Sequence, residues 1–298
     1  MKNIINYYYG FVVSEIIKNK DNYIFTYNNI EYEFCLIQYN RNELINTYKA
    51  ALENKKYVHE IIVNKFNSII TIYNSKEYIL VKKHYNNKNK ISINDILSFS
   101  TSIQYSGKIS WTKLWINKID YYEYQMKELK NISKEIVYLF NYYVGLSENA
   151  ISLLSYVNEN NVGYSISHNR IQSTETITDF YMPIGLLIDI RCRDICEYLK
   201  SCFFNNKVNE LDFNNIIEQA IVHANYNRDE LILFFSRLLF PTYFFDTYEM
   251  CMIDQKNIDK TNNCIKKIHK YELVLKQQYL KYQKVYNLPI IDWFNQIS

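Results

Sequence analysis

The chain has 298 residues, of which 48% are hydrophobic and 22% are charged, and its formal net charge is +3. This composition is that of a soluble globular protein long enough for two lobes with separate cores. The 34 basic and 31 acidic residues are too evenly balanced to favour a nucleic-acid partner. No apolar run approaches the ~18 residues that span a bilayer, and residues 1–10 lack the apolar core of a secretory signal. We therefore expect a cytoplasmic protein without membrane insertion.

The first 85 residues predict a small antiparallel sheet with one helix. A turn at Asn28-Asn29, where both residues tolerate positive φ, predicts a tight hairpin, and apolar residues at helical spacing predict a helix at 40–54. A four-residue turn at 74–77 separates a second pair of strands. Strands are predicted at 11–17, 23–27, 30–37, 69–73 and 78–81. We assign 1–85 to one lobe, and the polar stretch 85–90 to a linker.

From residue 91 onward the apolar residues recur at helical spacing, so 86–298 is predicted to form a larger, mostly helical lobe. Helices are predicted at 119–140, 142–157, 193–204, 211–224, 228–252 and 261–286. The first two are separated by a break near 142–145. The aromatic segment 234–248 is either core of this lobe, which we favour, or a docking surface.

Cysteine and tyrosine suggest no special chemistry. The six cysteines show no CxxC spacing and no histidine at ligand distance, which argues against a structural zinc site. The 30 tyrosines are attributed to AT-rich codon usage rather than to tyrosine cross-linking. The hydrolase, zinc-protease and P-loop motifs are all absent from the sequence.

Four short segments of the C-terminal half stand out together. They are YYVGLSENAI (142–151), SHNRI (167–171), DIRCRDICEY (189–198) and SRLLFPTYFF (236–245). In this order they resemble the spore-coat branch of the choline kinase and aminoglycoside phosphotransferase superfamily, and within it the YutH-type proteins of the CotS-like group. The resemblance implies a bilobal, kinase-like α+β fold, with a small antiparallel-sheet N-lobe and a larger, mostly helical C-lobe. It also implies association with the endospore coat of sporulating Firmicutes.

Active members of the superfamily carry His-Gly-Asp-Leu-His-x-x-Asn in the catalytic loop, where the Asp accepts the substrate proton and the Asn holds magnesium. Here His168 keeps the first position, but Asn169 replaces the Gly and Arg170 stands in place of the Asp. Arginine stays protonated and has no acceptor lone pair, so Arg170 cannot be a general base. That role is worth roughly 10²–10⁴ in rate. Glu175 occupies the Asn position, where it could still contact a cation.

The metal-binding aspartate of the family has two candidate positions here. Asp179-Phe180 resembles the magnesium-binding Asp-Phe of active members, but the spacing back from Arg193-Asp194 places Gly185 there instead. Asp179 and Glu175 are therefore the candidate metal ligands, and the alternative for Asp179 is a loop aspartate in solvent or capping a turn.

The other residues of the segment are expected to be structural. Arg193-Asp194 would open a helix, where an aspartate accepts unpaired backbone N–H groups. His168 is expected as a hydrogen-bonded core histidine. Arg170 is predicted to pair with Glu175 or Asp189, and Arg170→Asp should then lower the melting temperature without creating activity.

The N-lobe lacks the groups that hold the phosphates of ATP. Strand 30–37 contains neither Lys nor Arg, so the acidic residue of the following helix, Glu43 or Glu53, has no cation to pair with. No glycine occurs between residues 11 and 27, where a loop would approach the phosphates.

We therefore expect a non-catalytic, kinase-like scaffold of the endospore coat that binds other coat proteins and needs no cofactor. It would be made in the cytoplasm of the mother cell and then join the coat. Two alternatives remain: a divergent phosphotransferase using ATP and magnesium held by Asp179 and Glu175, and a sensor that binds ATP without turnover. The coat partner and the oligomeric state are left open by the sequence.

Overall fold

The computed structural model describes residues 1–38, 40–84, 86–108, 110–128, 134–205, 207–254 and 258–296. The chain forms two compact units. The first comprises Met1–Phe99 and Ile166–Ile188, and the second comprises Ser100–Ser165 and Asp189–Ser298. The chain passes between them after Phe99, and again within strands β7 (Tyr164–His168) and β8 (Leu186–Ile190), which form a two-stranded sheet. The segment resembling a catalytic loop thus belongs to the same unit as the N-terminal sheet.

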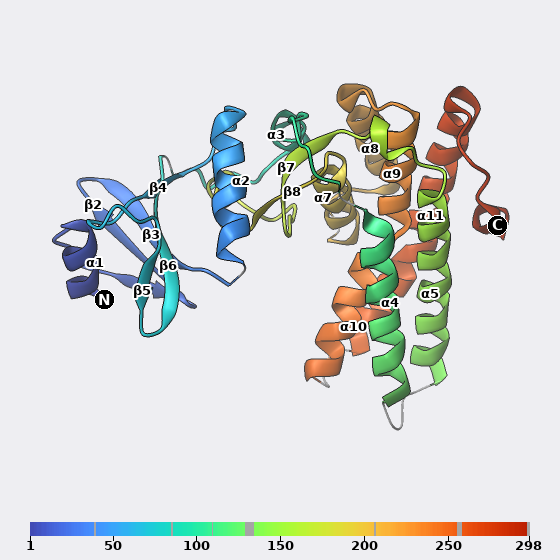
Figure 1. Ribbon diagram of the computed structural model, residues 1–298. Helices are drawn as coiled ribbons and strands as arrows, with labels where there is room; N and C mark the ends of the chain where they lie inside the picture. The colour runs from blue at the N-terminus through green and yellow to red at the C-terminus, as the bar shows by residue number, and fades with distance from the viewer. Residues whose placement is uncertain are drawn as a thin grey trace. The chain divides into compact units, whose positions relative to one another are not determined.

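The first unit is built on a six-stranded antiparallel sheet in the order β1-β2-β3-β6-β4, with β5 also paired to β6 (Figure 1). The strands are β1 (Ile17–Asn19), β2 (Asn22–Tyr27), β3 (Ile30–Leu36), β4 (Glu60–Ile62), β5 (Thr71–Tyr73) and β6 (Lys76–Lys82). The first predicted hairpin is confirmed. Asn28 and Asn29 have φ values of 49° and 61°, as a two-residue turn between twisted strands requires.

Three predictions for this unit were wrong in detail. Residues 11–16 are not a strand: helix α1 (Lys2–Tyr9) precedes them, and Phe11 and Ile16 pack against the core without ladder partners. The second hairpin turns over two residues, Asn74 and Ser75, both at positive φ, instead of four. Strand β4 was missed, because three residues are too few for an alternating pattern to be recognised.

The two faces of the sheet carry separate cores. Helix α1 covers one face, where its buried Ile5 packs with Phe25 and Phe34. Helix α2 (Arg41–Glu53), which confirms the predicted helix, covers the other face through Leu44. Met182, from the segment that follows the loop at 168–175, joins this second cluster. Alternate residues of β3 therefore point to different cores, and one set faces the loop segment.

The second unit is helical, and in Figure 1 helices α4 and α5 run side by side. Its helices are α4 (Trp111–Glu128), α5 (Lys134–Leu154), α7 (Arg193–Phe204), α8 (Glu210–Ala224), α9 (Arg228–Leu239), α10 (Thr242–Asp254), α11 (Ile258–Tyr286) and α12 (Asp292–Gln296), with a 3-10 turn η1 (Glu159–Asn161). The remaining helices, α3 (Ile93–Phe99) and α6 (Ile177–Phe180), belong to the first unit. Among the described residues no helix is both long and apolar enough to cross a membrane.

Three helix predictions differ from the structure. The helix predicted at 119–140 falls on two helices, α4, which ends at Glu128, and α5, which begins at Lys134; residues 129–133 lie outside the described residues. Helix α5 runs unbroken through 142–145, because Gly145 sits within the helix without needing positive φ. The helix predicted at 228–252 is two helices, α9 and α10, divided at Phe240 and Pro241. Proline lacks the N–H that would continue α9. The aromatic segment is core, as favoured: its phenylalanines and Tyr248 are buried.

Candidate functional site

The inward face of β3 carries acids where a kinase-like enzyme carries its phosphate-binding lysine. Glu31, Glu33 and Cys35 alternate on this face, and Cys35 packs into the α2 core. Lys83, directly after β6, places its Nζ 2.8 Å from a carboxylate oxygen of Glu31 and 2.8 Å from one of Glu33. The side chains of Lys83 and Glu33 are 6% and 11% exposed, so this pair is nearly dry, whereas Glu31 is 27% exposed.

The electrostatics of the triad favour a charged lysine. Burial by itself lowers the pKa of Lys83, but the hydrogen bonds to Glu31 and Glu33 outweigh it, so that the pKa is raised. The cation is fully engaged by two carboxylates of its own unit. A polyphosphate laid against this face would meet two acids and a lysine already neutralised by them.

His168 ends strand β7 and is a buried core histidine. Its ring stacks on Phe180, with centroids 4.5 Å apart, and its Nε2 lies 2.8 Å from the backbone carbonyl of Phe180. Phe99 of α3 packs against both rings. The histidine therefore fixes the loop to the segment at 180 by packing and one hydrogen bond.

Arg170 lies exposed two residues beyond His168, and Asn169 donates its backbone N–H to the carbonyl of Gly185 at 2.7 Å. Glu175 turns back within its own loop, where its Oε1 accepts the N–H of Gln172 at 3.2 Å. The predicted pairing of Arg170 stays a prediction.

Asp179 lies exposed on the single turn α6. Its Oδ2 accepts the hydroxyl of Thr176 at 2.7 Å, and its own N–H donates to the same hydroxyl at 3.2 Å. This is the geometry of a residue that closes a helical turn. Gly185, the other candidate position, has φ +82°, a conformation that favours glycine, and it connects α6 to β8. The described residues contain no group of three or more His, Cys, Asp or Glu side chains placed to hold a metal ion.

The described part of the predicted linker is hydrogen-bonded to the loop segment from Asn87 onward. The hydroxyl of Thr178 accepts the N–H of Asn87 at 2.7 Å and donates to its carbonyl at 3.0 Å. The N–H of Ile177 donates to the carbonyl of Asn89 at 2.9 Å. The N–H of Ile91 donates to the carbonyl of Glu175 at 3.1 Å. Polar backbone groups that a linker would offer a ligand are thus used inside the protein.

His59, directly before β4, is hydrogen-bonded to the same region. It is fully buried, its Nδ1 accepts the N–H of His84 at 3.3 Å, and its Nε2 lies 3.1 Å from the carbonyl of Thr178. Burial lowers the pKa of His59 to about 4, so the ring is neutral at pH 7 and Nε2 is its donor. The sequence analysis singled out neither His59 nor Lys83. The sequence does contain a signal for the triad. Glu31 and Glu33 lie two positions apart on β3, and Lys83 directly follows β6, the strand that pairs with β3.

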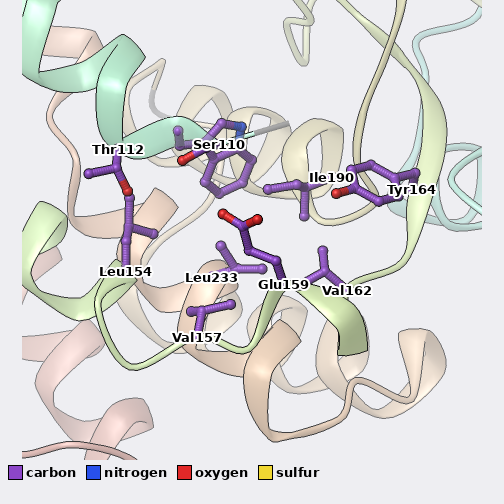
Figure 2. A pocket seen from close by; sticks show the side chains of 10 residues that line it. Ser110, Thr112, Leu154, Val157, Glu159, Val162, Tyr164, Ile190 and Leu233 are labelled. Atoms are coloured by element: carbon purple, nitrogen blue, oxygen red, sulfur yellow. The ribbon is translucent and has the colours of Figure 1, made fainter. Parts of the chain in front are cut away.

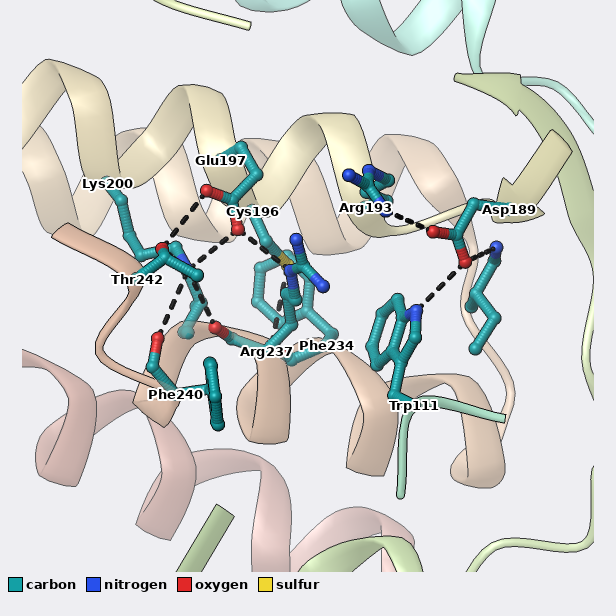
Figure 3. Close-up of polar contacts among 12 residues, drawn as sticks. Trp111, Asp189, Arg193, Cys196, Glu197, Lys200, Phe234, Arg237, Phe240 and Thr242 are labelled. Carbon is teal, nitrogen blue, oxygen red and sulfur yellow. Dashed lines mark hydrogen bonds and ion pairs between the residues drawn. The ribbon is translucent and has the colours of Figure 1, made fainter. Parts of the chain in front are cut away.

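A further polar cluster lies inside the second unit, between α7 and α9 (Figure 3). Glu197 accepts from Lys200 and from Arg237, each at 2.8 Å. Burial raises the pKa of Glu197, but the two cations outweigh burial and hold it below its usual range. Beside this cluster, Asp189 accepts the indole N–H of Trp111 at 2.9 Å and is paired with Arg193.

These contacts give the second cluster a structural role. Arg193 begins α7, as predicted, and Asp194 is buried in its first turn. The paired charges tie α7 to α9 and satisfy one another without a ligand.

The residues of the first unit do not fit ATP and magnesium. Arg170 cannot accept a proton, β3 presents carboxylates instead of a lysine, and Asp179 and Thr176 satisfy each other on α6.

Comparison with solved structures defines the class of protein. An aminoglycoside phosphotransferase from Alicyclobacillus acidocaldarius superposes with a TM-score of 0.66 at 10% identity, covering 95% of this chain and 96% of that one. A choline/ethanolamine kinase family protein from Mesorhizobium loti superposes with a TM-score of 0.52 at 8% identity, covering 88% and 87%. The predicted fold is confirmed: this is a protein of the aminoglycoside phosphotransferase and choline kinase-like fold.

The chain belongs to the family described as spore coat putative kinase YutH, whose model matches residues 2–279. It is 26% identical over 249 residues to the endospore coat-associated protein YutH of Bacillus subtilis (strain 168), covering 71% of this chain and 71% of that protein. The predicted family is thereby confirmed.

Proposed function

We propose that this protein is a non-catalytic, kinase-like component of the endospore coat that acts through contacts with other coat proteins. The coat assignment is carried over from the family and from the name of its Bacillus relative. The proposal includes synthesis in the cytoplasm of the mother cell, followed by contact with other proteins of the coat.

The observation that carries the proposal concerns the inward face of β3 and the linker, where a kinase-like enzyme would bind its nucleotide. The protein's own groups occupy both. Glu31 and Glu33 hold Lys83 on that face. The linker is hydrogen-bonded to residues 175–178. ATP could enter only by breaking buried ion pairs and a hydrogen-bonded ladder, and it would bring negative charge to two carboxylates.

The first test is a thermal-shift titration of the purified protein with ATP and magnesium, with ADP and an EDTA control. A ligand at about 100 times its Kd stabilises by about 2.7 kcal/mol, which moves the melting temperature of a chain of this size by several degrees. We expect no shift. A magnesium-dependent shift would instead support the ATP-binding sensor, and ADP release that depends on an added acceptor would support the divergent phosphotransferase.

Arg170→Asp tests the missing base. It restores a carboxylate at that position but not the cation of β3, so we expect no phosphotransfer. We also expect a lower melting temperature, because the ion pair predicted for Arg170 would be lost. Phosphotransfer gained from this single change would contradict the proposal.

A further inference from the structure

Helix α4 carries apolar side chains on two faces. Its inner face is buried within the second unit, and the residues that bury it are Trp111, Trp115, Ile119 and Tyr122. Among the described residues, no other element exposes as many large apolar side chains, which are Leu114, Ile116, Tyr121 and Tyr124. A helix at the surface of a globular unit needs one apolar stripe for its core, so a second stripe indicates a second contact surface.

The pocket at the start of α4 does not account for the outer face. It is lined by Thr112 of the helix and by Glu159 of η1, among others (Figure 2). Its cavity of about 30 Å³ has room for one or two water molecules. None of the four exposed apolar side chains lines this pocket. Their function must be sought on the outer surface of the helix.

The outer face has the residue spacing of a helix–helix contact. Tyr121 and Tyr124 are 52% and 63% exposed and lie three positions apart, so their rings share one side of α4. Asn117 and Glu128 continue this row at four positions before and after them. We call these four residues the tyrosine stripe. Steps of four, three and four residues are those of the seam between two packed helices.

The tyrosine rings are available for packing. Gln125 donates its amide N–H to the Tyr121 hydroxyl at 2.6 Å, so that hydroxyl has a partner on its own helix. Aromatic rings pack well against one another, and a tyrosine hydroxyl can stay in contact with water at the edge of such a contact. The stripe therefore suits a second aromatic surface better than an aliphatic or strongly charged one.

A row of charges runs beside the stripe. Lys113, Asp120 and Lys127 are exposed and follow one another at intervals of seven residues, so they lie along one flank of the tyrosines. When two copies of a helix pack antiparallel, the same flank of each copy meets its equivalent. The alternation of lysine, aspartate and lysine then decides which alignment of the two copies is favourable.

The charges favour one alignment of two antiparallel α4 helices. With the two-fold axis between positions 122 and 123, Tyr121 meets Tyr124 of the partner subunit, and Asp120 meets Lys127 of the partner subunit. Both contacts occur twice because the axis repeats them. With the axis near position 120, Asp120 would instead face its own equivalent, and Lys113 would face the partner's Lys127. Like charges disfavour that second alignment.

We propose that α4 joins two copies of this chain in an antiparallel, two-fold symmetric dimer centred on Tyr121 and Tyr124. A contact confined to residues 117–128 of each copy lies at the low end of interface sizes, so we expect a Kd on the order of 10 µM. The dimer is independent of the nucleotide face and of the coat assignment. In a scaffold it would present each partner-binding surface twice.

The experiment is sedimentation equilibrium of the full chain at concentrations from about 1 to 200 µM, which bracket that Kd. We expect a monomer–dimer equilibrium in the parent. Tyr124→Ser should weaken it at least about tenfold, because the symmetry removes two ring contacts at once. Tyr156→Ser is the matched control: Tyr156 is a 54% exposed tyrosine outside α4, and its loss should leave the equilibrium as in the parent.

Charge reversal tests the alignment. Asp120→Lys and Lys127→Glu should each weaken the dimer about tenfold, since each sets like charges opposite one another at two places. The double variant exchanges the two charges and should return to within about twofold of the parent. Unchanged melting temperatures will show that each variant is folded.

Four results would overturn the proposal. They are a parent that stays monomeric over the whole concentration range, a folded Tyr124→Ser variant that dimerises as the parent does, a Tyr156→Ser variant weakened as much as Tyr124→Ser, and a double charge variant no tighter than the single ones. None of these measurements involves ATP, so they fail or succeed separately from the nucleotide titration.

Discussion

Lys83 marks a clear departure of this chain from the residue pattern that the family resemblance implies. In the family resemblance the phosphate-binding cation stands on the strand that is β3 here, whereas in this chain it follows the neighbouring β6. There its ammonium is held by Glu31 and Glu33. A buried lysine that is held by two carboxylates contributes to the stability of the fold, because removing either partner would leave a buried charge without compensation.

Lys83→Met should destabilise the protein by about 3 kcal/mol, since it leaves Glu33 buried without its cation. Thermal denaturation followed by circular dichroism measures the loss. Lys82→Met is the matched control: the adjacent Lys82 pairs with Glu60 at 3.2 Å, and both side chains are partly exposed. Its loss should cost less than about 1 kcal/mol. Equal effects of the two substitutions would show that the triad contributes nothing special.

At the scale of elements, the main feature is the ladder between the linker and the segment around α6. His59, which directly precedes β4, adds a hydrogen bond from its Nε2 to the carbonyl of Thr178. The linker is therefore fixed on one side by α6, and the loop that resembles a catalytic loop is fixed with it. Opening this stretch would require these hydrogen bonds to break together, so its amides should be protected from hydrogen exchange.

Thr178→Val tests this ladder. The valine keeps the shape but removes the hydroxyl that bonds both the N–H and the carbonyl of Asn87, so we expect a loss of about 1–2 kcal/mol. Hydrogen exchange at the amides of Asn87 and Ile177 should accelerate. Thr174→Val, an exposed threonine in the same segment, should change stability by less than about 0.5 kcal/mol. Unchanged exchange at both amides would argue against a ladder that acts as a unit.

For the molecule as a whole, stability should depend on pH with opposite signs in the two units. Burial lowers the pKa of His59 in the first unit to about 4, so its contribution is complete above about 6.5 and is lost as the pH falls toward 4. In the second unit, burial raises the pKa of Glu272 to about 7, and the hydrogen bond from Tyr142 opposes this only in part. The neutral carboxyl is favoured in the fold, so this contribution is complete below about 4.5 and is lost as the pH rises through 7.

Glu272→Gln should abolish the second of these slopes. All three tryptophans lie in the second unit, so their fluorescence follows its unfolding. In the parent protein the contribution lost between pH 4.5 and 7 amounts to about 3 kcal/mol. We expect the urea midpoint of the variant to fall less over this range and to exceed that of the parent at pH 8. Glu148→Gln, an exposed glutamate on α5, should follow the parent. A variant that keeps the parent's slope would rule out Glu272 as its source.

The family, the fold class and much of the first unit could be predicted from the sequence. Asn28-Asn29 determines a tight turn by backbone sterics alone, and the helices α2, α7 and α8 follow from the spacing of their apolar residues, since both signals are local. The absence of a base at Arg170 is likewise a property of the side chain itself. No tertiary contact can give a guanidinium an acceptor lone pair.

Only the tertiary structure revealed the Lys83 triad and the hydrogen bonds between the linker and residues 175–178. Each joins residues distant in the sequence: Lys83 meets Glu31 across two strands, and Thr178 meets Asn87 across 91 positions. Sequence periodicity indicates which face of a helix or strand a residue lies on, but not which distant residues pack against that face. Burial and ion pairing depend on those distant contacts. The sequence by itself therefore determined the family, the kinase-like fold and the arginine at position 170, while the fold decided which charged groups meet on the inward face of β3.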